Sequence, residues 1–341
     1  MTAASGCARK KQAELPYALP ALVFGIALEV CSACAGGGER GDLSGAGASV
    51  GVGAGVGWTE PEVVASGVNS PHLVVADEAR VYWASDDGTV RALAHEDHGV
   101  AQMLATGQSY GWPGDLDQDA ANLYITTGDT VVRVPKAGGS LFVLASGQDD
   151  ADQLSLSATH IYFSSNAGVS RVSLAGGVVE LLAEIDGEAS GVSVSESGAV
   201  VSLEMIGSIG VLPPNGGTIS VIASGLTSPK QVETSAGEVF WAGGGDYAGD
   251  GEIWRSDQQG QAPKRLASGL RWPHFPTVFG AYVYFSDVDG GLVARVPKSG
   301  GALEVVAKGQ ASPLDVAVSP PYVYWCSSGD GTLRRAKGSF P

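Results

Sequence analysis

Two short motifs that alternate along the chain predict an all-β fold, a β-propeller of seven four-stranded antiparallel blades. One motif ends a strand with a sequence such as VLASG, and it occurs seven times if the divergent copy at 181–187 is included. Repeats of about forty residues are typical of propeller blades. The second motif is an apolar triplet whose seven copies follow one another at steps of 42, 38, 39, 39, 44 and 40 residues: VYW at 81–83, LYI at 123–125, IYF at 161–163, VVS at 200–202, VFW at 239–241, VYF at 283–285 and VYW at 323–325.

A single unit shows how each blade is built. The segment 114–148 contains GDLDQD, NLYITTG, TVVRVPKAGG and SLFVLASGQ, four stretches of strand length separated by turn residues. Short runs of alternating apolar residues bounded by Gly, Asp and Pro predict strands. The turn PKAGG at 135–139 has counterparts at 173–177, 213–217 and 297–301, and its paired glycines supply the positive φ that tight hairpins need.

The two ends of the repeat region predict how the ring closes. The segment EVVASG at 62–67 has the sequence of a fourth strand, yet no complete unit precedes it. The last unit, which begins at Pro313, stops before a fourth strand of its own. We therefore expect residues 61–66 to complete the last blade, which removes the open edges of the ring. The expected propeller is a single domain over residues 58–341.

Composition excludes one class of partner. The chain has 341 residues, 50 of them glycine, and a formal net charge of −16. A protein that binds nucleic acid needs a cationic face for the phosphate backbone. We therefore expect no nucleic acid and a cationic or neutral partner.

The N-terminal residues predict export and anchoring. Residues 1–33 contain Arg9-Lys10-Lys11, an apolar run and then small residues, in the order of an export signal. The segment SACA around Cys34 resembles a bacterial lipobox, and this resemblance implies that Cys34 is diacylated and becomes the mature N-terminus; simple secretion is the alternative. Residues 34–57 are rich in glycine and predict a flexible tether. The expected location is the bacterial cell envelope, at the outer membrane on its periplasmic or surface side, with the lipid as the only membrane contact.

A family resemblance supports the same interpretation. The run VYFSDVDGGLVARVPKSGG at 283–301 resembles the YWTD and NHL groups of propellers, with Tyr284-Phe285-Ser286-Asp287 in place of the Y-W-T-D signature. The wider pattern of Pro, an apolar strand, V-Y-W and R-V-P-K-x-G-G is most similar to predicted bacterial lipoprotein propellers of unassigned role. We expect a non-enzymatic envelope protein whose propeller is a binding or scaffold module.

One face of the propeller is the expected ligand-binding face. The loops that lead into the first strands and the turns between second and third strands should open on the same side. Exposed aromatic side chains near a concave mouth are good anchors for a protein, peptide or glycan partner, although tryptophans also serve to cover the seams between blades. The candidate residues are Tyr110, Trp112, Arg271, Trp272, His274, Tyr247 and His72.

The same face carries many aspartates, so a metal site is the alternative prediction. We expect no cofactor, because Asp-Gly turns explain most of these carboxylates. Ca²⁺ or another divalent ion on the acidic loop face is the alternative. The corresponding enzyme would be a metal-dependent lyase or lactonase with a site at the channel mouth, and its expected ligands are Asp115, Glu233, His72 and His274. No motif identifies a catalytic residue.

Overall fold

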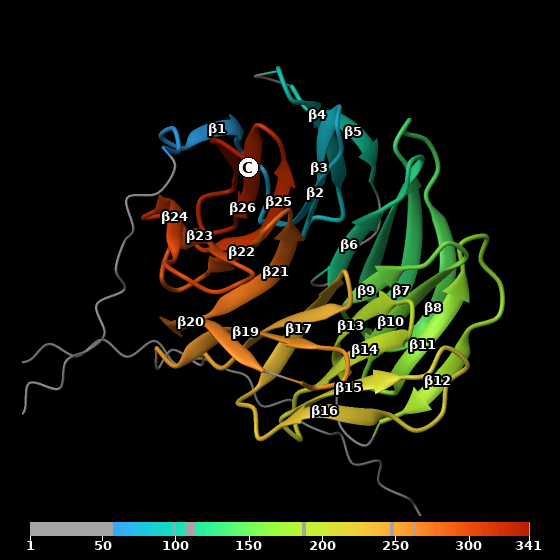
Figure 1. Ribbon diagram of the computed structural model, residues 1–341. Helices are drawn as coiled ribbons and strands as arrows, with labels where there is room; N and C mark the ends of the chain where they lie inside the picture. Colours follow the sequence, from blue (N-terminus) through green and yellow to red (C-terminus); the bar gives the residue numbers. More distant parts are fainter. Residues whose placement is uncertain are drawn as a thin grey trace, which may run out of the picture. The chain divides into compact units, whose positions relative to one another are not determined.

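The computed structural model describes residues 57–97, 100–106, 113–185, 189–245, 249–261 and 263–340. All of them belong to one compact unit, residues 49–341. They form strands arranged in seven sheets around a centre (Figure 1). Among these residues there is no helix long and apolar enough to cross a membrane. Cys34, the predicted export signal and the predicted tether, except for Gly57, lie outside the described residues.

The strands follow the chain from blade to blade. Blades 1 to 3 contain β2 (Pro71–Ala76), β3 (Arg80–Ser85), β4 (Val90–Ala94) and β5 (Gln102–Ala105); β6 (Asp115–Gln118), β7 (Asn122–Pro135) and β8 (Phe142–Ala151); β9 (Leu154–Leu156), β10 (His160–Ser165), β11 (Gly168–Ser173) and β12 (Glu180–Glu184). Blades 4 to 6 contain β13 (Ala189–Ser195), β14 (Gly198–Leu203), β15 (Ser208–Leu212) and β16 (Ser220–Ser224); β17 (Pro229–Ser235), β18 (Glu238–Gly243), β19 (Gly251–Asp257) and β20 (Lys264–Leu270); β21 (Pro273–Phe279), β22 (Tyr282–Asp287), β23 (Leu292–Pro297) and β24 (Glu304–Lys308). Blade 7 contains β25 (Pro313–Ser319), β26 (Tyr322–Ser327), β27 (Thr332–Lys337) and β1 (Glu62–Ala65).

Blade 2 is four-stranded although β7 is one continuous run. The chain turns back at Gly128, whose φ is +53°. The amide of Lys136 donates to the carbonyl of Ala121 at 2.9 Å, so the two ends of β7 lie side by side. The hydroxyl oxygens of Thr127 and Thr130 are 2.6 Å apart next to the turn. β7 therefore supplies both the second and the third strand of the blade.

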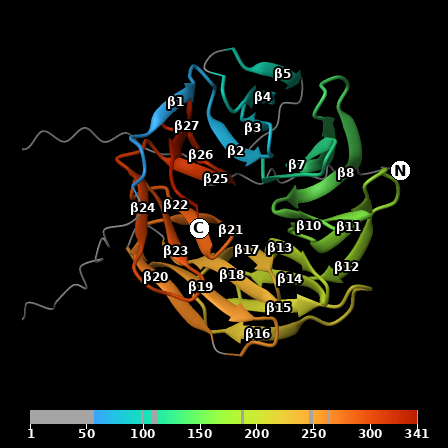
Figure 2. The same cartoon turned by 45° about the horizontal axis from the view of Figure 1, so that its top comes forward.

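The ring closes as predicted. β1 pairs antiparallel with β27, with Glu62 opposite Arg335 (Figure 2). The Arg335 guanidinium donates to the Glu62 carboxylate at 2.6 Å. In blade 6 the equivalent pair lies within one continuous hairpin, where Arg295 and Glu304 are 2.7 Å apart. Glu62 thus takes the place that Glu304 has in blade 6, and the prediction that the N-terminal strand completes the last blade is confirmed.

The apolar triplet forms the packing between blades. Successive residues of a strand point to opposite faces of the sheet. In β3, Tyr82 contacts the core shared with blade 2, and Trp83 contacts the core shared with blade 7. Each buried side chain of this size stabilises the fold by about 2–3 kcal/mol. Seven such cores, one between each pair of neighbouring blades, explain why the triplet is apolar in six blades. In blade 4 the three consecutive core residues are Ala199, Val200 and Val201, one position before the triplet VVS assigned from the sequence.

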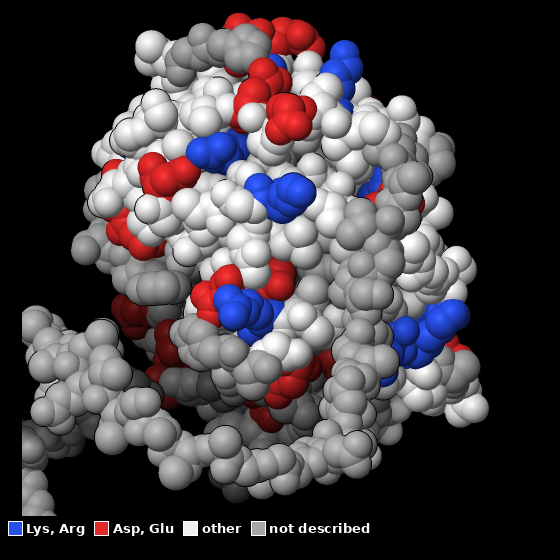
Figure 3. Space-filling view, turned by 90° about the vertical axis from the view of Figure 1, so that its left-hand side faces the viewer, with Lys and Arg blue, Asp and Glu red and all other residues white. Residues whose placement is uncertain are grey.

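Charged side chains on the outer surface are dispersed. On the side shown in Figure 3, Lys and Arg lie apart from one another, and several lie next to Asp or Glu. This side therefore offers no continuous basic surface of the kind that nucleic acid requires.

Candidate functional site

The loops that lead into the first strands and the turns between second and third strands lie together, as the sequence predicted. The Asp287 carboxylate, at the end of β22, accepts hydrogen bonds from the backbone amides of Arg271 and Trp272 at 2.9 and 2.8 Å. In blade 5, the Gly244 amide donates to the Thr227 carbonyl at 2.7 Å. We call this side of the propeller the mouth face.

A cavity of about 510 Å³ opens on the mouth face, and we call it the mouth cavity. Its volume is within the range of small-molecule sites. His72, Trp272 and His274, three of the predicted ligand-binding residues, line it. Arg271 is exposed and does not line it. The other three, Tyr110, Trp112 and Tyr247, lie outside the described residues.

His274 is a side chain of the mouth cavity that packs against two aromatic rings. Its ring lies edge-on to Trp272, with 4.9 Å between centroids, and 5.6 Å from Phe275. Both ring nitrogens are buried and have no hydrogen-bond partner among the described residues. Burial, reinforced by the positive charge of Lys230 and of His72, lowers the pKa of His274 to about 3. The ring is therefore neutral at physiological pH and offers one N–H donor and one acceptor.

A charged pair borders His274. The Lys230 ammonium lies 5.8 Å from the Trp272 ring centroid and 3.8 Å from the Glu204 carboxylate. Glu204 also accepts hydrogen bonds from the hydroxyls of Ser190, at 2.8 Å, and Ser228. Glu204 is thus held in place by side chains from blades 4 and 5.

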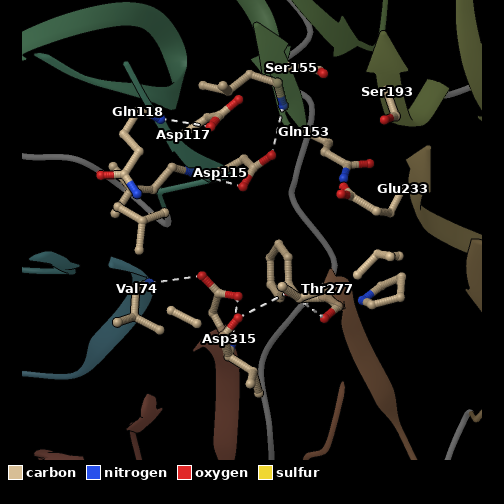
Figure 4. A pocket seen from close by; sticks show the side chains of 18 of the residues that line it. Val74, Asp115, Asp117, Gln118, Gln153, Ser155, Ser193, Glu233, Thr277 and Asp315 are labelled. Carbon is tan, nitrogen blue, oxygen red and sulfur yellow. Dashed lines mark hydrogen bonds between the residues drawn. The ribbon is translucent and has the colours of Figure 1, made fainter. Parts of the chain in front are cut away.

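A narrower cavity of about 350 Å³, the channel, is lined by the first strands of all seven blades. Phe275 lines both the channel and the mouth cavity, so it marks the boundary between them. Asp115, Glu233 and Asp315 come from three different blades and point toward the same central space (Figure 4). Asp117, two positions after Asp115 on the same strand, also lines the channel, because alternate residues of a strand point to the same side.

Burial changes the protonation of these carboxyl groups. It raises the pKa of Asp115 to about 7, and Asp117 adds to the effect. Burial, followed by the charges of Asp117 and Asp115, raises the pKa of Glu233 to about 8. The pKa of Asp315 rises well above its usual range, also mainly because of burial. At neutral pH the channel therefore retains protons that free carboxyl groups would release.

One position of the first strand links neighbouring blades by hydrogen bonds to backbone amides, and we call it the inner-ring position. Asp315 of blade 7 accepts from Val74 N of blade 1 at 2.8 Å, although they are 241 positions apart in the chain. Asp115 of blade 2 accepts from Leu154 N of blade 3 at 3.0 Å. In chain order the inner-ring residues are Leu73, Asp115, Gln153, Gly191, Gln231, Phe275 and Asp315.

The structure does not gather the four residues proposed as metal ligands. His72 and His274 line the mouth cavity, whereas Asp115 and Glu233 line the channel. Among the described residues, no group of three or more His, Cys, Asp or Glu side chains is placed to hold a metal ion.

Two aspartates of the mouth-face turns, Asp86 and Asp330, have side-chain partners. Asp86 lies 3.1 Å from His72 Nδ1, and although burial opposes it, hydrogen bonds from His72 and Ser70 lower the pKa of Asp86. Asp330 lies 2.7 Å from Arg334. These contacts agree with the explanation of the acidic residues by turn chemistry.

Several residues of the site carry no sequence signal that we used. Lys230, Gln231, Glu204 and Phe275 line the mouth cavity, and no motif marks them. The inner-ring residues could have been found by aligning the first strands of the seven units, because they recur at nearly the same place relative to the apolar triplet.

Comparisons with known proteins show the fold. No family model and no curated protein matches this sequence. Solved structures do match: a streptogramin B lyase (12% identity, TM-score 0.69, 82% of this chain and 97% of that one), virginiamycin B lyase from Staphylococcus aureus (13%, 0.68, 82% and 98%) and the WD40 propeller domain of Doa1 (18%, 0.69, 83% and 98%). At these identities the likeness shows a β-propeller and no shared function.

Proposed function

We propose that this propeller is a non-enzymatic binding module of the bacterial cell envelope, anchored through a lipid on Cys34, and that its ligand site is the mouth cavity. The observation that carries the proposal is the lining of this cavity. Trp272 and Phe275 provide apolar walls, and the polar part of the lining includes Lys230, Gln231, His274 and four carboxylate side chains. Cavities of this composition are typical of ligand sites. Propellers host both binding proteins and enzymes, so the fold itself does not decide between them.

The turn between β14 and β15 supports a protein or peptide partner over a glycan. It carries Met205 and Ile206 at its tip, with 75% and 61% of their surfaces exposed. At the equivalent turns, blade 1 has Asp86 and blade 7 has Asp330 in place of these apolar residues. Because Glu204, next to this tip, lines the mouth cavity, the two exposed apolar side chains stand close to its edge. Exposed apolar side chains beside a cavity are suited to contact with apolar residues of a partner.

Binding can be tested with Trp272→Ala and a panel of envelope-type probes: tripeptides, muramyl dipeptide and N-acetylglucosamine trimer. We expect at least one probe to raise the melting temperature of the wild type, and expect Trp272→Ala to abolish the shift because it removes one wall of the cavity. The control is Phe142→Ala, which removes a half-exposed aromatic residue of β8 far from the mouth face. A shift that persists in Trp272→Ala would place the ligand elsewhere.

The anchor needs a separate measurement. The intact mass of the protein extracted from envelopes of its native host should equal that of the chain from Cys34 plus acyl groups. An unacylated mass would exclude the lipid anchor and leave the binding site untouched.

A metal-dependent lyase or lactonase is the second candidate, and His274 favours it, because in the described part of the chain neither ring nitrogen has a hydrogen-bond partner and the same cavity also contains His72. Metal analysis of the same preparation tests this candidate. The enzyme would be favoured by a stoichiometric divalent ion that a chelator removes and that binds again when the metal is added back. The variant His274→Phe should then fail to bind the ion. A metal-free protein that still binds its probe would support the binding module.

A further inference from the structure

The inner-ring position differs at the junction between blades 5 and 6. Its residue in blade 5 is Gln231, which is 8% exposed. The backbone position in blade 6 that corresponds to Val74, Leu154 and Val192 is Pro276, and proline has no N–H to donate. The Gln231 Oε1 atom is buried and has no hydrogen-bond partner among the described residues.

The neighbouring residues of β21 extend this departure. Phe275 has a φ of +42°, in the left-handed region that residues other than glycine seldom occupy. Strained backbone of this kind is concentrated at functional sites. His274, directly before it, has two buried ring nitrogens without a partner among the described residues. Gln231 and His274 line the same mouth cavity. Unsatisfied buried polar atoms are uncommon in proteins, and here two adjacent strands hold them in residues that line one cavity.

These groups are complementary to one chemical unit. Gln231 Oε1 is an acceptor, so it requires a donor from the ligand. The neutral imidazole of His274 can donate one N–H to an acceptor of the ligand. A trans secondary amide has an N–H and a C=O that point in opposite directions within one rigid plane, and it can satisfy both.

We propose, on the basis of the function proposed above, that Gln231 and His274 bind a peptide bond. Gln231 Oε1 accepts the peptide N–H, and His274 donates to the peptide C=O. The adjoining side chain of the ligand is apolar or aromatic and packs against Trp272 and Phe275.

The charges around the cavity favour a peptide over an N-acetylated sugar, which also contains a secondary amide. The cavity lining contains four carboxylate side chains and a single lysine, so it favours a ligand with a positive charge, such as the amino terminus of a short peptide. The charged residues are Asp150, Asp152, Glu204, Asp289 and Lys230.

The test compares one peptide with its ester. The probes are glycyl-phenylalaninamide and the analogue in which the central peptide N–H is replaced by oxygen, both titrated calorimetrically into the full chain. The wild type should bind the amide about 10- to 100-fold more tightly, because the ester cannot donate to Gln231. Gln231→Leu should reduce this preference to about threefold or less.

Two further variants assign the two contacts. His274→Phe keeps an aromatic ring but loses the donor, so it should weaken the amide and the ester by the same factor, about 10-fold, because both retain the carbonyl. Gln118→Leu is the matched control. Gln118 also has a buried Oε1 without a partner among the described residues, but it lines the channel and not the mouth cavity. Its amide preference should remain that of the wild type, and melting curves should show that each variant is folded.

Several outcomes would overturn the proposal. They are equal affinity of the wild type for amide and ester, an unchanged preference in Gln231→Leu, and no binding of the dipeptide at about 10 mM. Binding of N-acetylglucosamine trimer without the dipeptide would replace the peptide by a sugar. If these results occur while a probe of the wider panel still depends on Trp272, the binding function stands and only the peptide assignment fails. If no probe depends on Trp272, both fail.

Discussion

Gln153 and Gln231 are the same residue at the same inner-ring position of blades 3 and 5, and each is 8% exposed. Gln153 Oε1 accepts hydrogen bonds from the amides of Val192 and Val232, both at 3.1 Å, and its Nε2 donates to the Val232 carbonyl at 3.0 Å. Gln231 Oε1 has no such partner in the part of the chain that the structure describes, since the next blade presents Pro276. The comparison shows that the neighbouring strand determines whether an identical side chain joins two blades or keeps an oxygen without a partner among the described residues.

The largest effect is expected from making the same substitution at both glutamines. Gln153→Leu removes three hydrogen bonds and leaves two buried N–H groups without an acceptor, so it should lower the free energy of unfolding by about 3 kcal/mol. Gln231→Leu removes an unsatisfied oxygen and should change it by less than about 1 kcal/mol in either direction. Urea unfolding followed by tryptophan fluorescence measures both. Equal losses would show that the two junctions are alike.

A smaller effect is expected at Gly191, the inner-ring residue that lies between the two glutamines in the chain. A Cβ there would be 2.6 Å from Gln153 Oε1 and 2.7 Å from the Lys230 carbonyl oxygen. Gly191→Ala should therefore destabilise the fold by about 2 kcal/mol through overpacking. In the Gln153→Leu background the additional loss should be smaller, because the displaced hydrogen bonds are already absent. Additive losses in the double variant would contradict this coupling.

The smallest effect concerns Glu233, two residues after Gln231 on β17. Its folded pKa of about 8 lies above its ordinary value of 4.5, so between these values the folded state binds more protons than the unfolded state. Stability should be full below about pH 4.5, fall as the pH rises through this window and level off above pH 8.

Glu233→Gln should flatten this decline and stabilise the protein at pH 8, because the variant has no carboxyl group to ionise there. Unfolding at pH 4.5, 6 and 8 provides the measurement. Glu238→Gln, which removes the partner of Arg255 at 2.7 Å on the outer part of the same blade, is the control and should leave the slope unchanged. A Glu233→Gln variant with the wild-type slope would exclude this carboxyl group as the source.

The amino-acid sequence by itself determined the seven blades, the four strands of each and the closure by residues near Glu62. These features depend on apolar alternation and turn residues, which act over a few neighbouring positions and repeat seven times. The sequence also placed His72, Trp272 and His274 on one face, because loop positions follow from the strand order. The four residues of the proposed metal site are divided between two cavities. The sequence could not show this division, because the strand order does not give the depth of a residue along the central axis.

Only the tertiary structure decided which polar side chains have partners. Gln153 bonds to Val232, 79 positions away in the chain, and Asp315 bonds to Val74 across the closed ring. For Gln231, the next blade places Pro276, which has no N–H, at the position where other blades place an amide donor. A side chain's own sequence neighbourhood fixes its strand and its face, whereas the hydrogen bonds at the centre depend on what a distant strand presents once all seven blades surround the channel.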